Sequence, residues 1–255
     1  MYYIRPEDVV KNHAKENTIP KWDVAILCFH SIEKTMYIVN CFNGRKIGYR
    51  LFSKCDCNMV FEAVIDNLKI GILGWCTGGG PLVASIIEEV SITGIRWLIG
   101  IGAAASIVND IKRNEIIFPT EIYINDAVSK YYYNQDWIKI DKEIYSLAYK
   151  SMVNTKYREV KGATVEALYR QCESMLKPWR EQGAQVVNWE LGPFYAVSQV
   201  YGIKAAWIGH VSDVETKEVW KNWYIDRKNV IKDVISICKA IISKIMEIMR
   251  DENKL

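Results

Sequence analysis

Two carboxylates in this 255-residue chain each follow an apolar segment with the length of a buried strand. Glu190 ends residues 185–190, and Asp213 ends residues 205–213. Ligands of open α/β sheets bind at the carboxyl ends of the strands, so the two acids are candidates for one site. Carboxyl groups in such a place can donate or accept protons and can stabilise positive charge. General acid–base chemistry is therefore the first hypothesis.

Each acid also has an ordinary structural explanation. Glu190 precedes a helix that we predict over residues 194–200, where the helix dipole favours a negative charge. Ser212 and Asp213 are both good helix-capping residues. The position of each acid at a predicted strand end, and not on a solvated helix, keeps the functional interpretation open.

Composition restricts the class of protein. Half of the residues are apolar, a quarter are charged, and the net charge is only +3. The basic residues are scattered and form no stripe for nucleic acid. The first eight residues lack the apolar core of a signal peptide, and no uncharged apolar run reaches membrane-spanning length. We expect a soluble, cytoplasmic protein that binds neither nucleic acid nor membrane.

Seven cysteines with irregular spacing do not indicate a metal centre. Cys55-Asp56-Cys57 is the only close pair, and no second pair or histidine follows it at zinc-finger spacing. Reduced thiols in a cytosolic protein explain them better, and we expect no metal ligands.

Apolar runs alternate with helical patterns along the whole chain. Continuous runs such as residues 24–29 and 70–74 predict strands that are covered on both faces. A glycine-rich turn at residues 77–81 then opens a predicted helix over residues 82–90, with Pro81 in its first turn. Further predicted strands cover residues 36–39, 46–52, 96–101, 115–119, 185–190 and 205–213, with another beginning at Glu159; further predicted helices cover residues 142–150, 171–182 and 229–250.

This alternation predicts an α/β protein. No linker or repeat interrupts the chain, so we expect residues 1–255 to form a single domain. The expected architecture is a three-layer α/β/α sandwich with a mixed, mainly parallel central sheet.

Short segments in a fixed order carry a family resemblance. They are a Gly-Gly-Pro turn before a helix (residues 79–81), a glycine-flanked strand (94–102), the segment 111–117, Trp189-Glu190 and Ser212-Asp213. Together, and with the interval between the last two, they resemble the nucleoside phosphorylase and nucleosidase superfamily. The resemblance spans most of the chain and implies a phosphorylase-like fold.

The resemblance implies a role for each acid. In the superfamily, the glutamate at the position of Glu190 binds the ribose 2′- and 3′-hydroxyls, and the aspartate at that of Asp213 protonates the leaving base. Breaking an N-glycosidic bond leaves negative charge on the base and an oxocarbenium-like sugar. A positioned acid neutralises the negative charge on the base, and a carboxylate stabilises the oxocarbenium-like sugar.

The departures from the family pattern concern phosphate. Phosphorylases hold it with a glycine and an arginine after the first strand, where this chain has Phe29 and Glu33. Gly100 replaces a second arginine and Ala103 a hydroxyl residue on the central strand. Phosphate needs cationic or N–H donors, so phosphorolysis is disfavoured. Nucleosidases of the superfamily place a water-activating glutamate at the position of Glu33, which favours hydrolysis; the alternative for Glu33 is an exposed loop acid.

Other contacts are implied less strongly. His13 matches a histidine that reaches a neighbouring subunit's site in hexameric phosphorylases, although a surface histidine is the simpler explanation. Leu168 stands where the family has a base-stacking phenylalanine, for which Tyr169 or Trp189 could compensate. The remaining candidate substrate-binding residues are Asn188, Gly102, Ala103 and His30.

The leading hypothesis is a nucleosidase that hydrolyses the N-glycosidic bond of a nucleoside, with Asp213 and Glu33 as catalytic residues and Glu190 as the ribose clamp. A nucleoside phosphorylase with an atypical phosphate site and a non-catalytic nucleoside-binding homologue are the alternatives. The resemblance implies a homo-oligomer (dimer, trimer or hexamer) and no cofactor. It leaves the base open, since Asp213 suits a purine whereas the Gly-Gly-Pro turn resembles a pyrimidine branch.

Overall fold

The structure is a computed structural model that describes residues 3–14, 19–54, 59–215, 220–221 and 228–252. The strands are β1 (Val24–Cys28), β2 (Arg45–Lys46), β3 (Val60–Ile65), β4 (Leu68–Leu73), β5 (Trp97–Ser106), β6 (Ile116–Tyr123), β7 (Trp137–Lys139), β8 (Arg158–Thr164), β9 (Val186–Asn188), β10 (Lys204–Glu215) and β11 (Trp220–Lys221). The α-helices are α1 (Pro6–Ala14), α2 (Ile32–Cys41), α3 (Gly80–Ser91), α4 (Lys142–Ser151), α5 (Glu173–Glu181), α6 (Leu191–Val200) and α7 (Lys228–Glu252). Cys55 and Cys57 lie outside the described residues.

The strands form one mixed sheet whose central strands run parallel. Strands β4, β1, β5 and β10 are neighbours in that order, and each pair among them is parallel. Ala25 of β1, for example, is in register with Gly71 on one side and Leu98 on the other. The predicted α/β class with a parallel centre is thus confirmed, and antiparallel strands β2 and β3 extend one edge.

At the other end the sheet closes on itself. Strand β5 pairs with β10 and also with β9, while β6 and β8 connect β10 to β9. The strands β5, β10, β6, β8 and β9 therefore form a closed ring. Closure places β9 and β10, which are consecutive strands separated by α6, on the two sides of β5.

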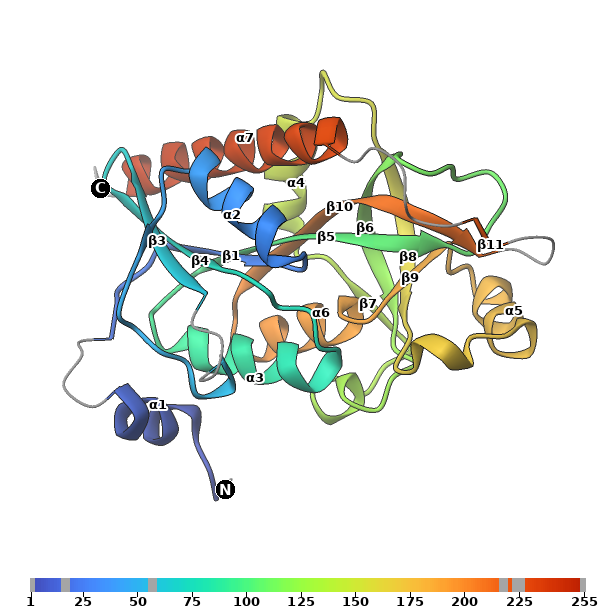
Figure 1. Ribbon diagram of the computed structural model, residues 1–255, viewed down its shortest axis with the longest axis horizontal. Coiled ribbons are helices and arrows are strands. Elements are labelled where there is room, and N and C mark those ends of the chain that lie inside the picture. Colours follow the sequence, from blue (N-terminus) through green and yellow to red (C-terminus); the bar gives the residue numbers. More distant parts are fainter. Residues whose placement is uncertain (1–2, 15–18, 55–58, 216–219, 222–227, 253–255) are drawn as a thin grey trace.

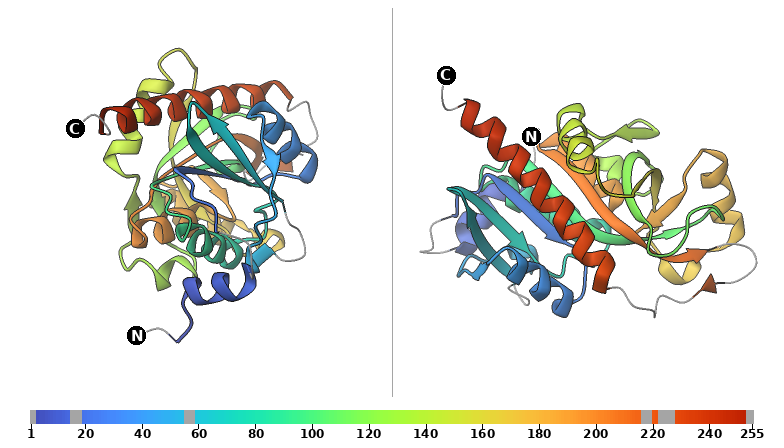
Figure 2. Two further views of the ribbon diagram at one scale, coloured as in Figure 1. Left: turned by 90° about the vertical axis from the view of Figure 1, so that its left-hand side faces the viewer. Right: turned by 90° about the horizontal axis from the view of Figure 1, so that it is seen from above.

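Helices cover both faces of the parallel part of the sheet (Figures 1 and 2). Alternate residues of β1 show why its apolar run is continuous: Ala25 and Leu27 pack with residues of α3 and α6, whereas Val24 and Ile26 pack with residues of α2 and α7. All of these side chains are buried. A strand that is covered on both faces needs apolar residues at every position.

Two of the predicted strands were wrong. Residues 36–39 were expected as a strand but belong to α2, and the expected strand at 46–52 is reduced to the last residue of β2. Thr35, Ile38 and Val39 form the buried face of α2, while Met36 and Tyr37 point outward. The spacing of three and four residues is helical, and a four-residue apolar run is too short to reveal it.

Two glycines of β5 leave room for the buried side chain of Trp207. The side chain of Trp207 in β10 is fully buried, and Gly100 lies opposite it in β5. A Cβ atom on Gly100 would lie 2.5 Å from Trp207 Cδ1, and one on Gly102 would lie 2.6 Å from its Cζ2. The glycines are therefore required by packing between these strands.

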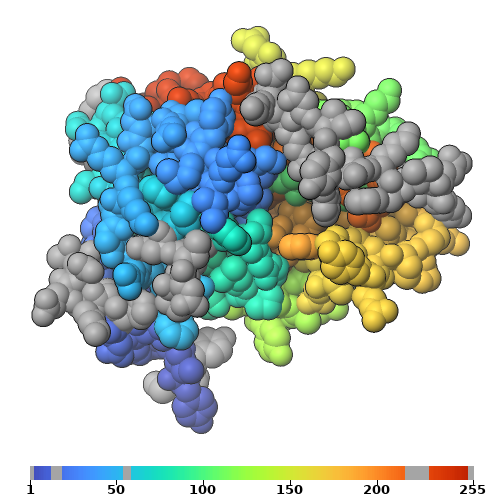
Figure 3. Space-filling view, in the orientation of Figure 1, coloured from blue at the N-terminus to red at the C-terminus, as the bar shows by residue number. Residues whose placement is uncertain are grey.

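The surface view in Figure 3 shows the blue residues of the α2 region and the yellow residues around α5 on one face of the molecule, with the blue-green residues around α3 between them. In the part of the chain that the structure describes, no helix combines the length and the apolar character needed to cross a membrane.

Candidate active site

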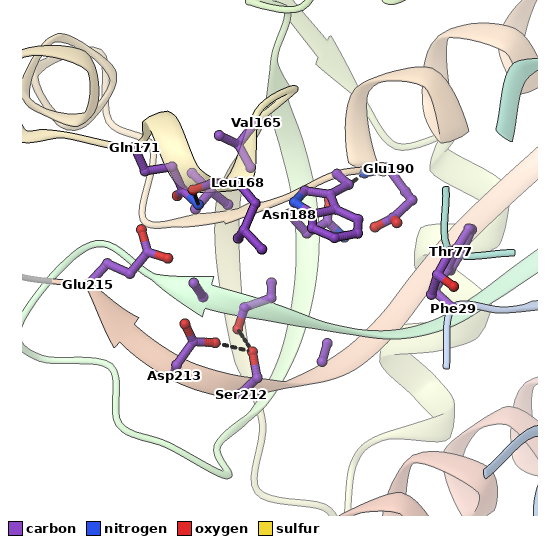
Figure 4. A pocket seen from close by; sticks show the side chains of 15 residues that line it. Phe29, Thr77, Val165, Leu168, Gln171, Asn188, Glu190, Ser212, Asp213 and Glu215 are labelled. Carbon is purple, nitrogen blue, oxygen red and sulfur yellow. Dashed lines mark hydrogen bonds between the residues drawn. The ribbon is translucent and has the colours of Figure 1, made fainter. Parts of the chain in front are cut away.

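A cavity of about 160 Å³ opens at the carboxyl ends of β5 and β9 and the last residues of β10 (Figure 4). Three consecutive alanines of β5 lie along it, so small side chains leave the space open. The described residues that line it are Phe29, Thr77, Ala103, Ala104, Ala105, Val165, Leu168, Gln171, Val187, Asn188, Trp189, Glu190, Ser212, Asp213 and Glu215.

Strand register brings the two candidate acids to this cavity. Ala105 of β5 is in register with Val187 of β9 on one side and with Asp213 of β10 on the other. Two strand spacings separate those neighbours, which is about 10 Å. Glu190 follows Val187 by three residues, at the start of α6. The acids therefore lie on opposite sides of the β5 end, with the alanines between them.

The turn that holds Glu190 is fixed by Asn188. The Asn188 Oδ1 atom accepts hydrogen bonds from the backbone N–H groups of Glu190 at 2.9 Å and Leu191 at 2.8 Å. Glu190 occupies the N-cap position of α6, but its side chain makes no capping hydrogen bond. Asn188 thus supplies the cap, and the Glu190 carboxyl group is left to line the cavity.

Burial changes the acidity of Glu190. The residue is 4% exposed, and burial raises the pKa of its carboxyl group from 4.5 to about 8, against a small opposing effect of a backbone hydrogen bond. A strongly perturbed carboxyl group in a cavity is a mark of functional sites. A structural cap would gain from being charged, whereas this group is held in a place that disfavours its charge.

A bulge in β10 directs Asp213 into the cavity. Val211 pairs with Ala104 and Asp213 pairs with Ala105, so Ser212 is the extra residue. Bulges redirect side chains and often occur next to active sites. Asp213 is 4% exposed, and its Oδ1 atom accepts a hydrogen bond from the Ser212 hydroxyl group.

Glu215 is a third acid of the cavity, which the sequence interpretation missed. We expected the strand to end at Asp213, whereas β10 continues to Glu215. Residues two apart in a strand face the same side, so Glu215 lines the cavity together with Asp213. Burial, and then the charge of Asp213, raise the pKa of Glu215 from 4.5 to about 7. The two-residue repeat of side chains along a strand was the sequence signal that could have revealed Glu215.

The structure divides the other candidate residues into two groups. Ala103, Leu168, Asn188 and Trp189 line the cavity. Three others do not: Gly102 packs against Trp207, Tyr169 is 94% exposed, and His30 is buried with its ring stacked on that of His210 at a centroid distance of 5.9 Å.

Glu33 does not join the other acids in this structure. It lies in the first turn of α2, four residues after the cavity-lining Phe29, and its side chain is exposed. His13 belongs to α1, and its side chain lies outside the described part of the chain. The structure therefore brings together Glu190 and Asp213, with Glu215 added.

The cavity carries acidic but no basic side chains. None of the described residues that line it is a lysine, arginine or histidine. Within the described ranges, no group of three or more His, Cys, Asp or Glu side chains is arranged to hold a metal ion. The polar chemistry of the described walls is thus that of carboxyl, amide and hydroxyl groups.

The comparisons with known proteins agree with this fold. A family model described as the phosphorylase superfamily matches residues 71–247. The uncharacterized protein R802 of Acanthamoeba polyphaga mimivirus is 25% identical over 169 residues, which are 66% of this chain and 67% of that protein. The DeoD-type purine nucleoside phosphorylase of Clostridium perfringens (strain ATCC 13124) is 24% identical over 157 residues, 60% of this chain and 67% of that enzyme.

Solved structures show the same fold. Purine nucleoside phosphorylase from Toxoplasma gondii, in complex with immucillin-H, superposes with a TM-score of 0.74 at 14% identity, covering 88% of this chain and 92% of the other. A futalosine hydrolase mutant of Helicobacter pylori strain 26695 superposes with a TM-score of 0.69 at 15% identity, covering 88% of this chain and 99% of the other.

The chain belongs to the phosphorylase superfamily. Its relatives and fold neighbours with known activity include both phosphorylases and a hydrolase. The matched range begins within β4 and includes Glu190 and Asp213, but it does not include Glu33.

Proposed function

We propose that this protein is a nucleosidase that hydrolyses the N-glycosidic bond of a nucleoside. The observation that supports hydrolysis over phosphorolysis is the cavity wall, whose described charged groups are all carboxyl groups. Asp213 would be the general acid that protonates the leaving base. Glu190 would bind the ribose hydroxyls.

The position of each acid suits its role. Glu190 and Asp213 lie on opposite sides of the β5 end, so a sugar above the alanines would have one acid on either side. As the bond breaks, the sugar gains positive charge and the base gains negative charge. The positive charge on the sugar would favour the ionised form of Glu190, and a proton from Asp213 would neutralise the negative charge on the base.

The same wall is unsuited to phosphate. A dianion is bound by cations or by several N–H donors, and neighbouring carboxylates repel it. The position where the resemblance implies a phosphate-binding arginine is Gly100, and Trp207 fills the space beside it. An arginine side chain at this position would collide with the buried ring.

Glu33 remains the proposed water-activating base. It follows Phe29, which lies at the same end of the cavity as Glu190, where the sugar is placed. For this role the exposed Glu33 carboxylate has to reach the water that attacks the sugar.

The deciding experiment measures base release from a panel of purine and pyrimidine nucleosides, with and without phosphate. Hydrolysis predicts equal release in both conditions and free ribose as the second product. Release that requires phosphate and yields ribose 1-phosphate would contradict it. Binding heat without any product would instead support a non-catalytic nucleoside-binding protein.

A substitution tests the assignment of the acid. Asp213→Asn should lower base release about 10²- to 10⁴-fold, the usual contribution of a general acid, while nucleoside binding persists. Asp136→Asn is the matched control, because Asp136 is exposed and does not line the cavity. Turnover by Asp213→Asn at the rate of the control would refute the role of Asp213.

A further inference from the structure

The cavity has two chemically different ends, which Figure 4 shows. Glu190, Thr77 and Phe29 lie toward one end, and Gln171, Glu215 and Asp213 lie toward the opposite end, with Ser212 between the two groups. This inference rests on the proposed function. If Glu190 holds the sugar and Asp213 protonates the base, the base extends toward Gln171 and Glu215.

Gln171 presents a hydrogen-bond acceptor at that end. Its Nε2 atom donates to the Leu168 backbone carbonyl at 3.1 Å, which fixes the orientation of the amide, because the flipped amide would place two oxygens together. Its Oε1 atom is buried and has no hydrogen-bond partner among the described residues. An unpaired buried acceptor is costly, so a ligand that supplies a donor gains by pairing with it.

Glu215 provides a second acceptor. An ionised carboxyl group only accepts hydrogen bonds, and a protonated one still has an accepting oxygen. Burial and Asp213 raise its pKa to about 7, so both forms are present near neutral pH, and both can receive a hydrogen bond from an N–H group.

We propose that Gln171 and Glu215 form the base-recognition end of the cavity and select bases that carry an exocyclic amino group on the edge farthest from the sugar. An amino group has two N–H donors and can pair with both acceptors. A carbonyl oxygen in its place would face the Gln171 Oε1 atom, leaving two acceptors desolvated and unpaired. A site built to bind a donor discriminates against the analogue that lacks it.

Paired substrates test this on the unaltered protein. The pairs are adenosine and purine riboside, guanosine and inosine, and cytidine and uridine, where the first member of each has the amino group. In the pair that is turned over best, kcat/KM should be at least about tenfold higher for the amino-bearing member. Equal values within every pair, or a preference for the member without the amino group, would overturn the proposal.

A matched pair of variants assigns the preference to Gln171. Gln171→Met keeps the length of the side chain but removes the acceptor, so the ratio within the pair should fall toward one. Gln182→Met is the control, because Gln182 is exposed at the end of α5, and it should keep the ratio of the parent protein. An unchanged ratio in a folded Gln171→Met protein, judged by its thermal unfolding midpoint, would remove Gln171 from the proposal.

The design separates failure of this inference from failure of the proposed function. Base release at equal rates within every pair would leave hydrolysis standing and reject the recognition of the amino group. If no nucleoside is cleaved, the proposed function fails, and calorimetric binding of the same pairs still tests the base-recognition end. Tighter binding of the amino-bearing members would support it, and equal or absent binding would reject it.

Discussion

Replacing Glu190 by glutamine should make the protein more stable at high pH, although it removes the proposed ribose clamp. The buried carboxyl group has a pKa of about 8 instead of 4.5. Between these two values the folded protein holds a proton that the unfolded chain has released. Stability therefore falls as the pH rises through this window, and it stays low above pH 8. The Glu190→Gln protein has no proton to lose at this position.

The size of the effect follows from the two pKa values. The pKa shift from 4.5 to about 8 corresponds to a destabilisation of about 1 kcal/mol at pH 5, about 3 kcal/mol at pH 7 and about 5 kcal/mol at pH 9. The exposed fraction of Glu190 is only 4%, so solvent screening reduces this destabilisation only a little. The stability of Glu190→Gln relative to the parent protein should thus rise by about 4 kcal/mol from pH 5 to pH 9.

Urea unfolding at several pH values, followed by tryptophan fluorescence, measures this difference. Constant effects of the substitution, such as altered packing, cancel when the two pH values are compared. Glu181→Gln is the control, because it makes the same replacement at an exposed residue of α5. Parallel pH profiles for Glu190→Gln and the parent protein would show that the carboxyl group is not held in an environment that disfavours its charge.

Three further substitutions test the packing and the chemistry. Gly209→Ala places a Cβ atom 2.2 Å from the Gly102 backbone oxygen and should lower the free energy of unfolding, measured in urea, by about 3 kcal/mol. Its control is Gly48→Ala, where the added Cβ atom meets no atom within 4 Å, and the free energy of unfolding should change by less than about 0.5 kcal/mol. Tyr195→Phe removes a buried hydroxyl that donates one hydrogen bond and accepts another, so the thermal midpoint should fall by an amount equivalent to about 2 kcal/mol; an unchanged midpoint would mean that these bonds contribute nothing. Glu33→Gln should reduce kcat about 10²-fold with little change in KM if Glu33 activates water, and turnover equal to that of the parent protein would assign water activation to another group.

Much of the fold was predictable because local chemistry dictated it. The continuous apolar run of β1 requires cover on both faces, and Pro81 after the glycine turn lies in the first turn of α3 as expected. The failures occurred where the local signal was short. Residues 36–39 are apolar in a row, and only the packing of Ile38 and Val39 against the sheet shows that they are helical.

The candidate site was predictable in part for the same reason. Glu190 and Asp213 stand out because each follows an apolar run, and ligands of open α/β sheets bind at the carboxyl ends of strands; both acids line the cavity. Gln171 precedes α5 and follows no strand, and although the resemblance pointed to Leu168 and Tyr169 close by, nothing marked Gln171 itself. Glu215 was missed because the strand continues past the bulge at Ser212.

The sequence by itself determined the alternation of strands and helices, the two acids at predicted strand ends, and the absence of an arginine at Gly100. These depend on residue type and on neighbours within a few positions. Only the tertiary structure decided that β9 and β10 flank the end of β5, that the bulge directs Asp213 and Glu215 into one cavity, and that Glu33 is exposed and does not line this cavity. The physical reason is that strand pairing, register and burial depend on contacts between segments that are far apart in the chain, and such contacts alone set which carboxyl groups lose their water.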